Sequence, residues 1–158
     1  IDTRVKKAAH MCQALNGFSH RTDSPLISFS VNDFIEESIN FLERFARLKE
    51  MEVNTSMPDE HLLLATEPAL LQYVMTKIFF VFVDASDKTH HEQLNINLRE
   101  KNGEIQIQFS QLYENIDEDS HPGLAIDDVE KLALEKLGAS LQIEKENNHL
   151  SICLAFSK

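Results

Sequence analysis

The sequence predicts an α+β fold, a two-layer α/β sandwich in which a mixed, mostly antiparallel sheet carries helices on one face. Four late segments (94–98, 105–109, 141–143 and 150–156) alternate apolar and polar residues, as strands with one buried face do. Segments 33–49 and 67–85 instead keep helical spacing of their apolar residues. The chain has 158 residues, 42% of them hydrophobic, which suffices for one domain with a buried core. Helices gathered on one side of such a sheet give the predicted sandwich.

Residues 1–22 are predicted to form a separate N-terminal helix before a domain at 27–158. Pro25 ends the helical pattern, because the residue before a proline is pushed toward extended conformations. A narrow apolar stripe, to which Phe18 adds, repeats every three or four residues, the spacing of a coiled-coil seam. This interaction seam consists of Val5, Ala8, Cys12 and Leu15. A seam needs a second helix, so we expect it to form a homodimer or to pack on the rest of the domain.

The first half of the domain alternates short strands with two helices. Residues 27–31 alternate like a strand, and Asn32 is the predicted N-cap of a helix that runs to about Lys49. Segments 51–55 and 62–65 are further strand candidates. Residues 78–83 taken alone resemble a buried strand, but the spacing of the apolar residues before them predicts one helix over 67–85. Pro68 suits the first turn of that helix.

The second half is predicted to contain two hairpins around one helix. Asn102-Gly103 supplies the positive φ angles of a tight turn between 94–98 and 105–109. Residues 113–122 are acidic and form a predicted loop. A helix follows over 124–137, with Gly138 as the residue that closes it. The last hairpin pairs 141–143 with 150–156.

Charge and composition exclude several classes of partner. The net charge is −11, and residues 1–22 carry +3 of it, which leaves −14 on the remainder. Such an acidic body disfavours nucleic acid and anionic membrane surfaces. The longest apolar run is too short to span a membrane. Cys12 and Cys153 are predicted to be buried free thiols in a reducing cytoplasm. The first residue is Ile1, so we expect the chain to be a piece of a longer protein.

Segment 67–85 resembles the "N box" helix of histidine-kinase-type ATP-binding domains. That helix reads roughly acid-Pro-x-x-Leu-x-x-Val-Leu-x-Asn-Leu-x-x-Asn-Ala-x-x-Ala, and here the asparagine positions hold Lys77 and Val81. The order of elements over about 26–157 is similar to that of the same catalytic domains. Residues 7–20 resemble the second helix of the kinase dimerisation bundle, with Leu15-Asn16-Gly17-Phe18-Ser19-His20 at its end. The resemblance implies the histidine-kinase catalytic fold.

The other nucleotide boxes of the family are reduced or missing in this chain. Where the family has Asp-x-Gly-x-Gly for adenine, this chain has Phe109-Ser110-Gln111-Leu112-Tyr113. Gly123-Leu124-Ala125-Ile126 resembles a reduced second glycine box, and no glycine-rich lid remains to cradle phosphates. Val81 offers no oxygen to magnesium. We therefore expect no bound ATP, metal or other cofactor, and Lys77, Val81, Gln111 and Gly123 to mark a degenerate site.

Three functions are compatible with these residues. The first is a degenerate, cytoplasmic histidine-kinase-like domain of two-component signalling, which binds a response regulator or a kinase. The second is a histidine phosphotransferase in a phosphorelay, with His10 or His20 as phosphoacceptor. The third is the C-terminal fragment of a sensor histidine kinase. No Ser/His/Asp or Cys/His grouping can be assembled from sequence order, and the His90-His91-Glu92 run lacks the spacing of a structured metal site.

Overall fold

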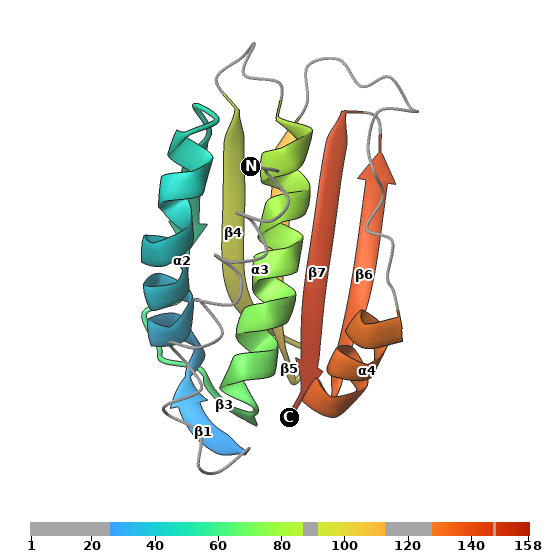
Figure 1. Cartoon of the computed structure of the whole chain (residues 1–158). Coiled ribbons are helices and arrows are strands. Elements are labelled where there is room, and N and C mark those ends of the chain that lie inside the picture. Colours follow the sequence, from blue (N-terminus) through green and yellow to red (C-terminus); the bar gives the residue numbers. More distant parts are fainter. Residues whose placement is uncertain (1–25, 87–91, 113–127, 147) are drawn as a thin grey trace.

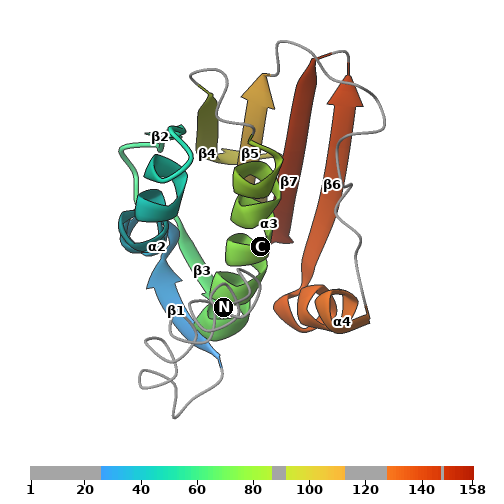
Figure 2. The same cartoon turned by 45° about the horizontal axis from the view of Figure 1, so that its top comes forward.

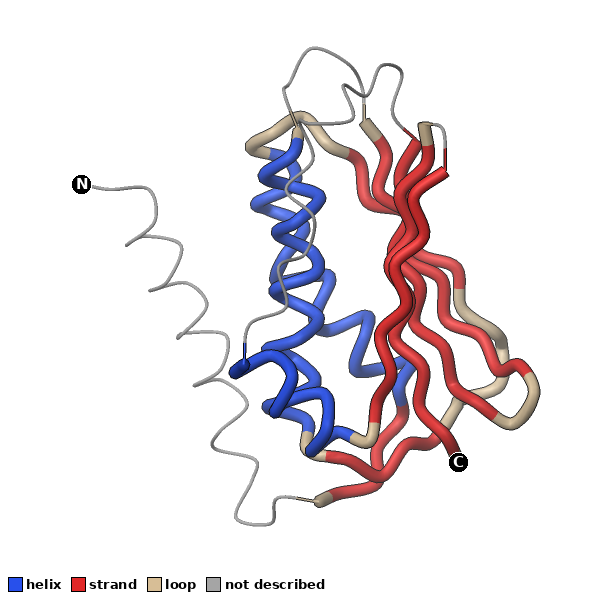
Figure 3. The backbone as a smooth tube through the Cα atoms, turned by 90° about the vertical axis from the view of Figure 1, so that its right-hand side faces the viewer, coloured by secondary structure: helices blue, strands red, loops and turns tan. Residues whose placement is uncertain are grey.

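The computed structural model describes residues 26–86, 92–112, 128–146 and 148–158, and these form a helical layer on one face of a sheet (Figures 1 and 3). This arrangement confirms the predicted α+β sandwich. The elements are β1 (Ile27–Ser30), α2 (Val31–Arg47), β2 (Glu52–Ser56), β3 (Leu63–Thr66), α3 (Pro68–Ala85), β4 (Gln93–Lys101), β5 (Glu104–Leu112), α4 (Asp128–Leu137), β6 (Ala139–Glu146) and β7 (His149–Ser157). The predicted N-terminal helix and the start of the predicted helix at 124 lie outside the described residues.

The main sheet has five strands in the order β2-β4-β5-β7-β6. Only β2 and β4 pair in parallel, and the other three pairs are antiparallel, so the predicted mixed, mostly antiparallel sheet is confirmed. β2 and β6 form its two edges. β1 and β3 pair separately as a two-stranded ladder below α2 and α3, with Ile27 opposite Thr66 (Figure 1). Sequence alternation predicted these short strands but not that they form a sheet of their own.

α3 is the central helix of the core. It lies between α2 and α4 over the sheet (Figure 2), and Phe79 and Phe82 on it are fully buried. Burying such side chains stabilises the fold by roughly 1.5–3 kcal/mol each. α3 is the one helix of the described part that is long and apolar enough to cross a membrane, yet 61% of it is buried inside this fold. The prediction of a helix rather than a strand over 78–83 is confirmed.

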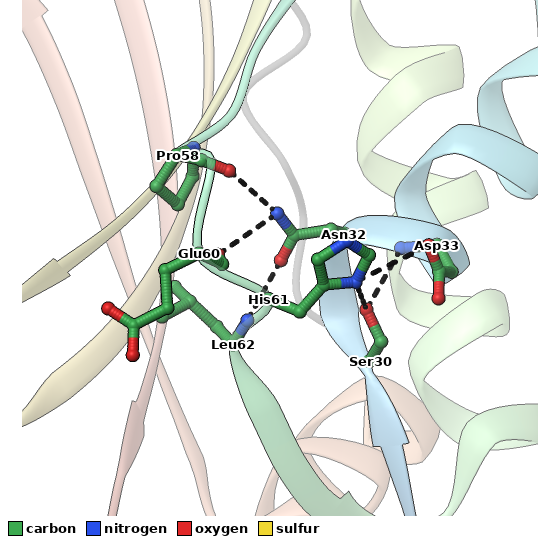
Figure 4. Close-up of polar contacts among 7 residues, drawn as sticks. All are labelled: Ser30, Asn32, Asp33, Pro58, Glu60, His61 and Leu62. Carbon is green, nitrogen blue, oxygen red and sulfur yellow. Dashed lines mark hydrogen bonds and ion pairs between the residues drawn. The ribbon is translucent and has the colours of Figure 1, made fainter.

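The prediction of Asn32 as the N-cap of α2 is wrong. Ser30 is the cap, and its Oγ accepts a hydrogen bond from the backbone N–H of Asp33 at 3.3 Å. Asn32 instead points into the β2–β3 connection (Figure 4). Its Nδ2 donates to the carbonyls of Pro58 and Glu60 at 2.9 and 3.3 Å, and its Oδ1 accepts from the backbone N–H of Leu62 at 3.0 Å. The amide side chain thereby ties the start of α2 to a loop about 30 residues away.

The predicted turn between β4 and β5 and the predicted glycine after α4 both have the positive φ angles that these roles require. Asn102 and Gly103 have φ angles of 55° and 77°, which fit the tight turn between β4 and β5. Gly138 has a φ angle of 64° directly after α4, as predicted for the residue that closes this helix. α2 ends at Arg47, earlier than predicted, and Glu50 at φ 56° leads into β2.

Candidate functional site

The face of α3 that looks toward α4 carries the two residues at the asparagine positions of the resemblance. Lys77 and Val81 are four residues apart and therefore share one face of the helix. The Nζ of Lys77 lies 3.3 Å from Oε1 of Glu130 on α4. The Glu130 side chain is only 10% exposed, whereas that of Lys77 is 36% exposed. The ammonium group thus balances a nearly buried carboxylate and links two helices.

The surroundings of this ion pair offer little to a magnesium–phosphate group. The Lys77 ammonium also lies 5.8 Å from the centre of the Tyr73 ring. Val81 is half-buried and packs against the core with its apolar side chain. Magnesium requires oxygen ligands, and phosphate requires positive charge that is not already neutralised. At these two positions the chain provides an apolar group and a paired cation.

Gln111 lies near the carboxyl end of β5 and faces the core. Its neighbours across the ladder are Leu94 on β4 and Leu150 on β7. The residue is 1% exposed, and neither atom of its amide has a hydrogen-bond partner within the described part of the chain. Glu92, just before β4, also has one buried carboxylate oxygen without a partner among the described residues. Buried polar atoms without partners are costly, so this end of the sheet is not optimised for stability.

A buried polar network, which the sequence did not predict, lies on the other side of α3, against α2. Ser38 Oγ is 2.6 Å from Gln72 Oε1 and 2.7 Å from the carbonyl oxygen of Phe34. Gln72 Nε2 donates to Thr76 Oγ1 at 3.1 Å. Polar residues at 38, 72 and 76 break otherwise apolar helix faces, and that interruption was the available signal. The network links α2 to α3 through buried side chains and thereby fixes how the two helices pack.

Ser30, Asp33 and His61 meet beside the amino end of α2 (Figure 4). His61 Nδ1 lies 2.9 Å from Ser30 Oγ and 3.6 Å from Asp33 Oδ1. In a catalytic triad the serine and the carboxylate contact opposite ring nitrogens of the histidine, whereas here both lie closest to Nδ1 of His61. The grouping is therefore a capping cluster. No cluster of three or more metal-ligating side chains occurs within the residues that the structure describes.

Several predicted site residues lie outside the described residues, and the structure therefore does not test them. They are the phosphoacceptor candidates His10 and His20, the box residue Gly123, and the seam residues Val5, Ala8, Cys12 and Leu15.

Cys153 is a free cysteine, as predicted, but it is half-buried rather than buried. It belongs to the strand face that is turned away from the helices, because its neighbours Ile152 and Leu154 face the core. Partial burial raises the pKa of the Cys153 thiol. Arg99 opposes this rise, and Glu144 and Glu104 add to it. Since thiolate is the reactive form, the environment keeps this thiol poorly reactive.

No protein-family profile matches the chain, and no curated protein matches it either. Solved structures do match it. The histidine kinase domain of the Erythrobacter litoralis blue-light activated kinase EL346 has a TM-score of 0.69 at 10% identity, with 98% of this chain and 80% of that chain covered. Acinetobacter baumannii histidine kinase AdeS has a TM-score of 0.66 at 9% identity, with 94% and 76% covered.

The catalytic domain of histidine kinase ThkA, in a nucleotide-free form, matches with a TM-score of 0.64 at 13% identity, over 84% of this chain and 95% of that domain. ThkA in complex with the response regulator TrrA also matches at a TM-score of 0.64, and there the chain spans about half (48%) of the kinase. At such low identities the likeness concerns the backbone. The chain has the fold of the histidine-kinase catalytic domains.

Proposed function

We propose that the chain is a degenerate histidine-kinase-like domain of cytoplasmic two-component signalling, which does not bind Mg-ATP and acts by binding another protein. The fold supports the kinase-like half of this proposal. The Lys77–Glu130 ion pair carries the other half. Lys77 occupies the position at which the resembling domains have the first of the two asparagines that hold metal and phosphate.

The ion pair disfavours a triphosphate for an electrostatic reason. Glu130 is a nearly buried carboxylate, and an incoming phosphate would have to compete with it for the Lys77 ammonium. Drawing the ammonium away from Glu130 would remove the cation that balances a carboxylate of low exposure, and such a loss costs several kcal/mol when the charge is fully buried. Val81, one turn further along α3, supplies no oxygen to replace a water of Mg²⁺.

The proposed partner is a response regulator or a kinase. The ThkA structure contains a response regulator bound to a kinase of the same fold, which supports this class of partner. The seam Val5, Ala8, Cys12 and Leu15 is the proposed surface for a homodimer or for that partner. The net charge of −11 argues against nucleic acid as an alternative target.

Isothermal titration calorimetry with ATP and Mg²⁺ tests the nucleotide half. We expect no binding heat from the full chain, while an active histidine-kinase catalytic domain titrated in parallel binds. The double variant Lys77→Asn/Val81→Asn is a matched control, because it restores the two amide side chains in the same scaffold. Micromolar binding of ATP by the unaltered chain would overturn the proposal.

Binding of purified receiver domains and kinases from the source cell to the immobilised chain tests the partner half. We expect one of them to bind, and Leu15→Asp to weaken that binding or to dissociate the homodimer. Lys49→Asp, outside residues 1–22, is the control that changes charge and leaves the seam residues unaltered. Absence of binding to every receiver domain and kinase would reject a signalling partner of this class.

A further inference from the structure

Figure 3 shows the described helices on one face of the main sheet, and none of them covers the opposite face, which we term the outer face. Residues of the outer face alternate along each strand with core residues such as Ile96 and Ile107, and the register aligns them in rows across the sheet. Uncharged polar side chains, mostly amides and hydroxyls, fill the two middle rows. They are Asn54, Asn95, Ser110 and Ser151 in one row, and Ser56, Asn97, Gln108, Cys153 and Gln142 in the next.

The charged residues of the outer face lie at its two ends, and these ends differ in sign. The cationic end lies where β4 stops and β5 begins, and the acidic end lies where β2 begins and β6 stops. The cationic end holds Arg99 and Lys101 together with the carboxylate of Glu104, and the acidic end holds Glu52, Glu144 and Glu146. The face therefore changes from positive to negative along its strands, although the domain as a whole is acidic.

We propose that the outer face is a self-association surface, on which a second copy of the chain stacks face to face with its strands in the opposite direction. Such a pairing is isologous, so one surface must complement itself. Amides and hydroxyls both donate and accept hydrogen bonds, so a surface made of them can bond to its own copy. Reversed strands place the cationic end of one copy over the acidic end of the other, whereas strands in the same direction would bring like charges together.

The size of the outer face is sufficient for a weak dimer. Strands of five to nine residues, with about 3.3 Å per residue and about 4.8 Å between strands, give the five-stranded sheet a face of about 600 Å². Two copies would together bury about 1,200 Å², the lower limit of specific interfaces. Depletion of charge in the middle is typical of interface cores.

The net charge of the chain favours this face over the rest of the surface. Two copies, each with a net charge of −11, repel one another, and the repulsion is smallest where the middle of the surface carries no carboxylate. Two of the side chains are also held in place before association. Gln108 Nε2 donates to Ser151 Oγ at 2.7 Å, and Arg99 Nε donates to Gln106 Oε1 at 2.8 Å. Ordered side chains lose less entropy when a partner binds.

Sedimentation equilibrium tests this pairing in the full chain with Leu15→Asp, a background in which the seam is disrupted. We expect a dimer that forms as the protein concentration rises. Asn97→Asp puts a carboxylate in the middle of the face, opposite its own copy, and should weaken the dimer by about tenfold or more. Asn40→Asp, at an exposed position of α2, makes the same chemical change and the same change in net charge, and should alter the dimer by no more than about twofold.

A charge swap tests the direction of the strands. Arg99→Glu should weaken the dimer, and adding Glu144→Arg should restore most of it, because the two ends have then exchanged their charges. Unchanged circular dichroism shows that each variant is folded. A Leu15→Asp protein that stays monomeric up to about 1 mM overturns the proposal, and so do equal effects of Asn97→Asp and Asn40→Asp. The pairing goes beyond the proposed function and can fail while that function holds, since it uses neither the seam nor the Lys77–Glu130 pair.

Discussion

Two buried amides in this molecule have opposite surroundings. Asn32, at the start of α2, makes three hydrogen bonds to the β2–β3 connection. Gln111, near the end of β5, is 1% exposed and makes none within the described residues. Both cost free energy to desolvate, and only Asn32 recovers it from the fold. The comparison separates a polar residue that the fold requires from one that it merely tolerates.

Gln111 belongs to the stretch 109–113, which the sequence resemblance predicts to stand at the family's adenine box. Protein sequences break stability rules most often where a constraint other than folding has acted. The Lys77–Glu130 pair belongs to the same category, because a charged pair at low exposure seldom adds much stability over an apolar pair. The start of α2 with its satisfied amide is therefore framework, whereas the α3–α4 face with Lys77 is the candidate remnant of a nucleotide site.

The largest expected effect comes from Asn32→Ala. The substitution leaves the carbonyls of Pro58 and Glu60 and the N–H of Leu62 without their protein partner, so we expect a loss of about 3 kcal/mol. Urea denaturation followed by circular dichroism measures it. Asn95→Ala, at an exposed position of β4, is the matched control and should change stability by less than about 0.5 kcal/mol. Equal effects of the two substitutions would remove the contrast between the amides.

Lys77→Met should have the next largest effect. It removes the cation 3.3 Å from the nearly buried Glu130 carboxylate, and we expect a loss of about 1–2 kcal/mol because Lys77 itself is partly exposed. The double variant Lys77→Met/Glu130→Leu should recover most of that loss, since it removes both charges. The same urea series measures all three proteins. A double variant as unstable as the single one would show that the pair does not act as a unit.

Gln111→Met should stabilise the protein by about 1 kcal/mol, because it replaces an unpartnered amide by an apolar side chain of similar length. Gln108→Met is the control on the same strand. Gln108 Nε2 donates to Ser151 Oγ at 2.7 Å, so its loss should destabilise the protein slightly. A destabilised Gln111→Met protein would mean that the amide has a partner in solution, and the two amides would then be alike.

The smallest effect concerns the raised pKa of Cys153. In a Cys12→Ser background, DTNB should react with the folded protein more slowly at pH 8 than with the unfolded protein, and the rate should rise with pH beyond the range of an ordinary thiol. The pKa of the Cys153 thiol is higher in the folded than in the unfolded protein. The contribution of this thiol to the free energy of unfolding is therefore fully present below the unfolded-state pKa and is lost as pH rises through the folded-state pKa. Arg99→Gln should slow the reaction further, because Arg99 lowers this pKa. Equal rates in folded and unfolded protein would contradict the burial effect.

Much of the fold was predictable because the spacing of apolar residues within each segment indicates whether it forms a strand or a helix. Strand alternation located β4, β5 and β7, and Asn102-Gly103 located the turn between the first two. Helical spacing before residue 78 gave α3 correctly despite its strand-like end. The parallel pairing of β2 with β4 and the separate β1–β3 ladder were not predictable, since they depend on contacts between distant segments.

The same limit explains what sequence reasoning missed at the candidate site. The resemblance placed Lys77 at an asparagine position without giving it a partner, and only the packing of α4 identifies Glu130. Asn32 was misassigned as a cap because its partners at 58–62 are remote in sequence. Ser30, one of the usual capping residues, had been placed in the preceding strand.

The open margin of the sheet at β6 affects how the isolated protein will behave. Among the described strands, β6 pairs on one side only, with β7, so the backbone groups on its other side form a template for addition of a foreign strand. Charged residues on this edge, Glu144, Lys145 and Glu146, disfavour strand addition, and the net charge of −11 adds repulsion between molecules. The isoelectric point is near 5.0, so acidification toward that value weakens the repulsion, and we expect clustering of molecules in mildly acidic buffer.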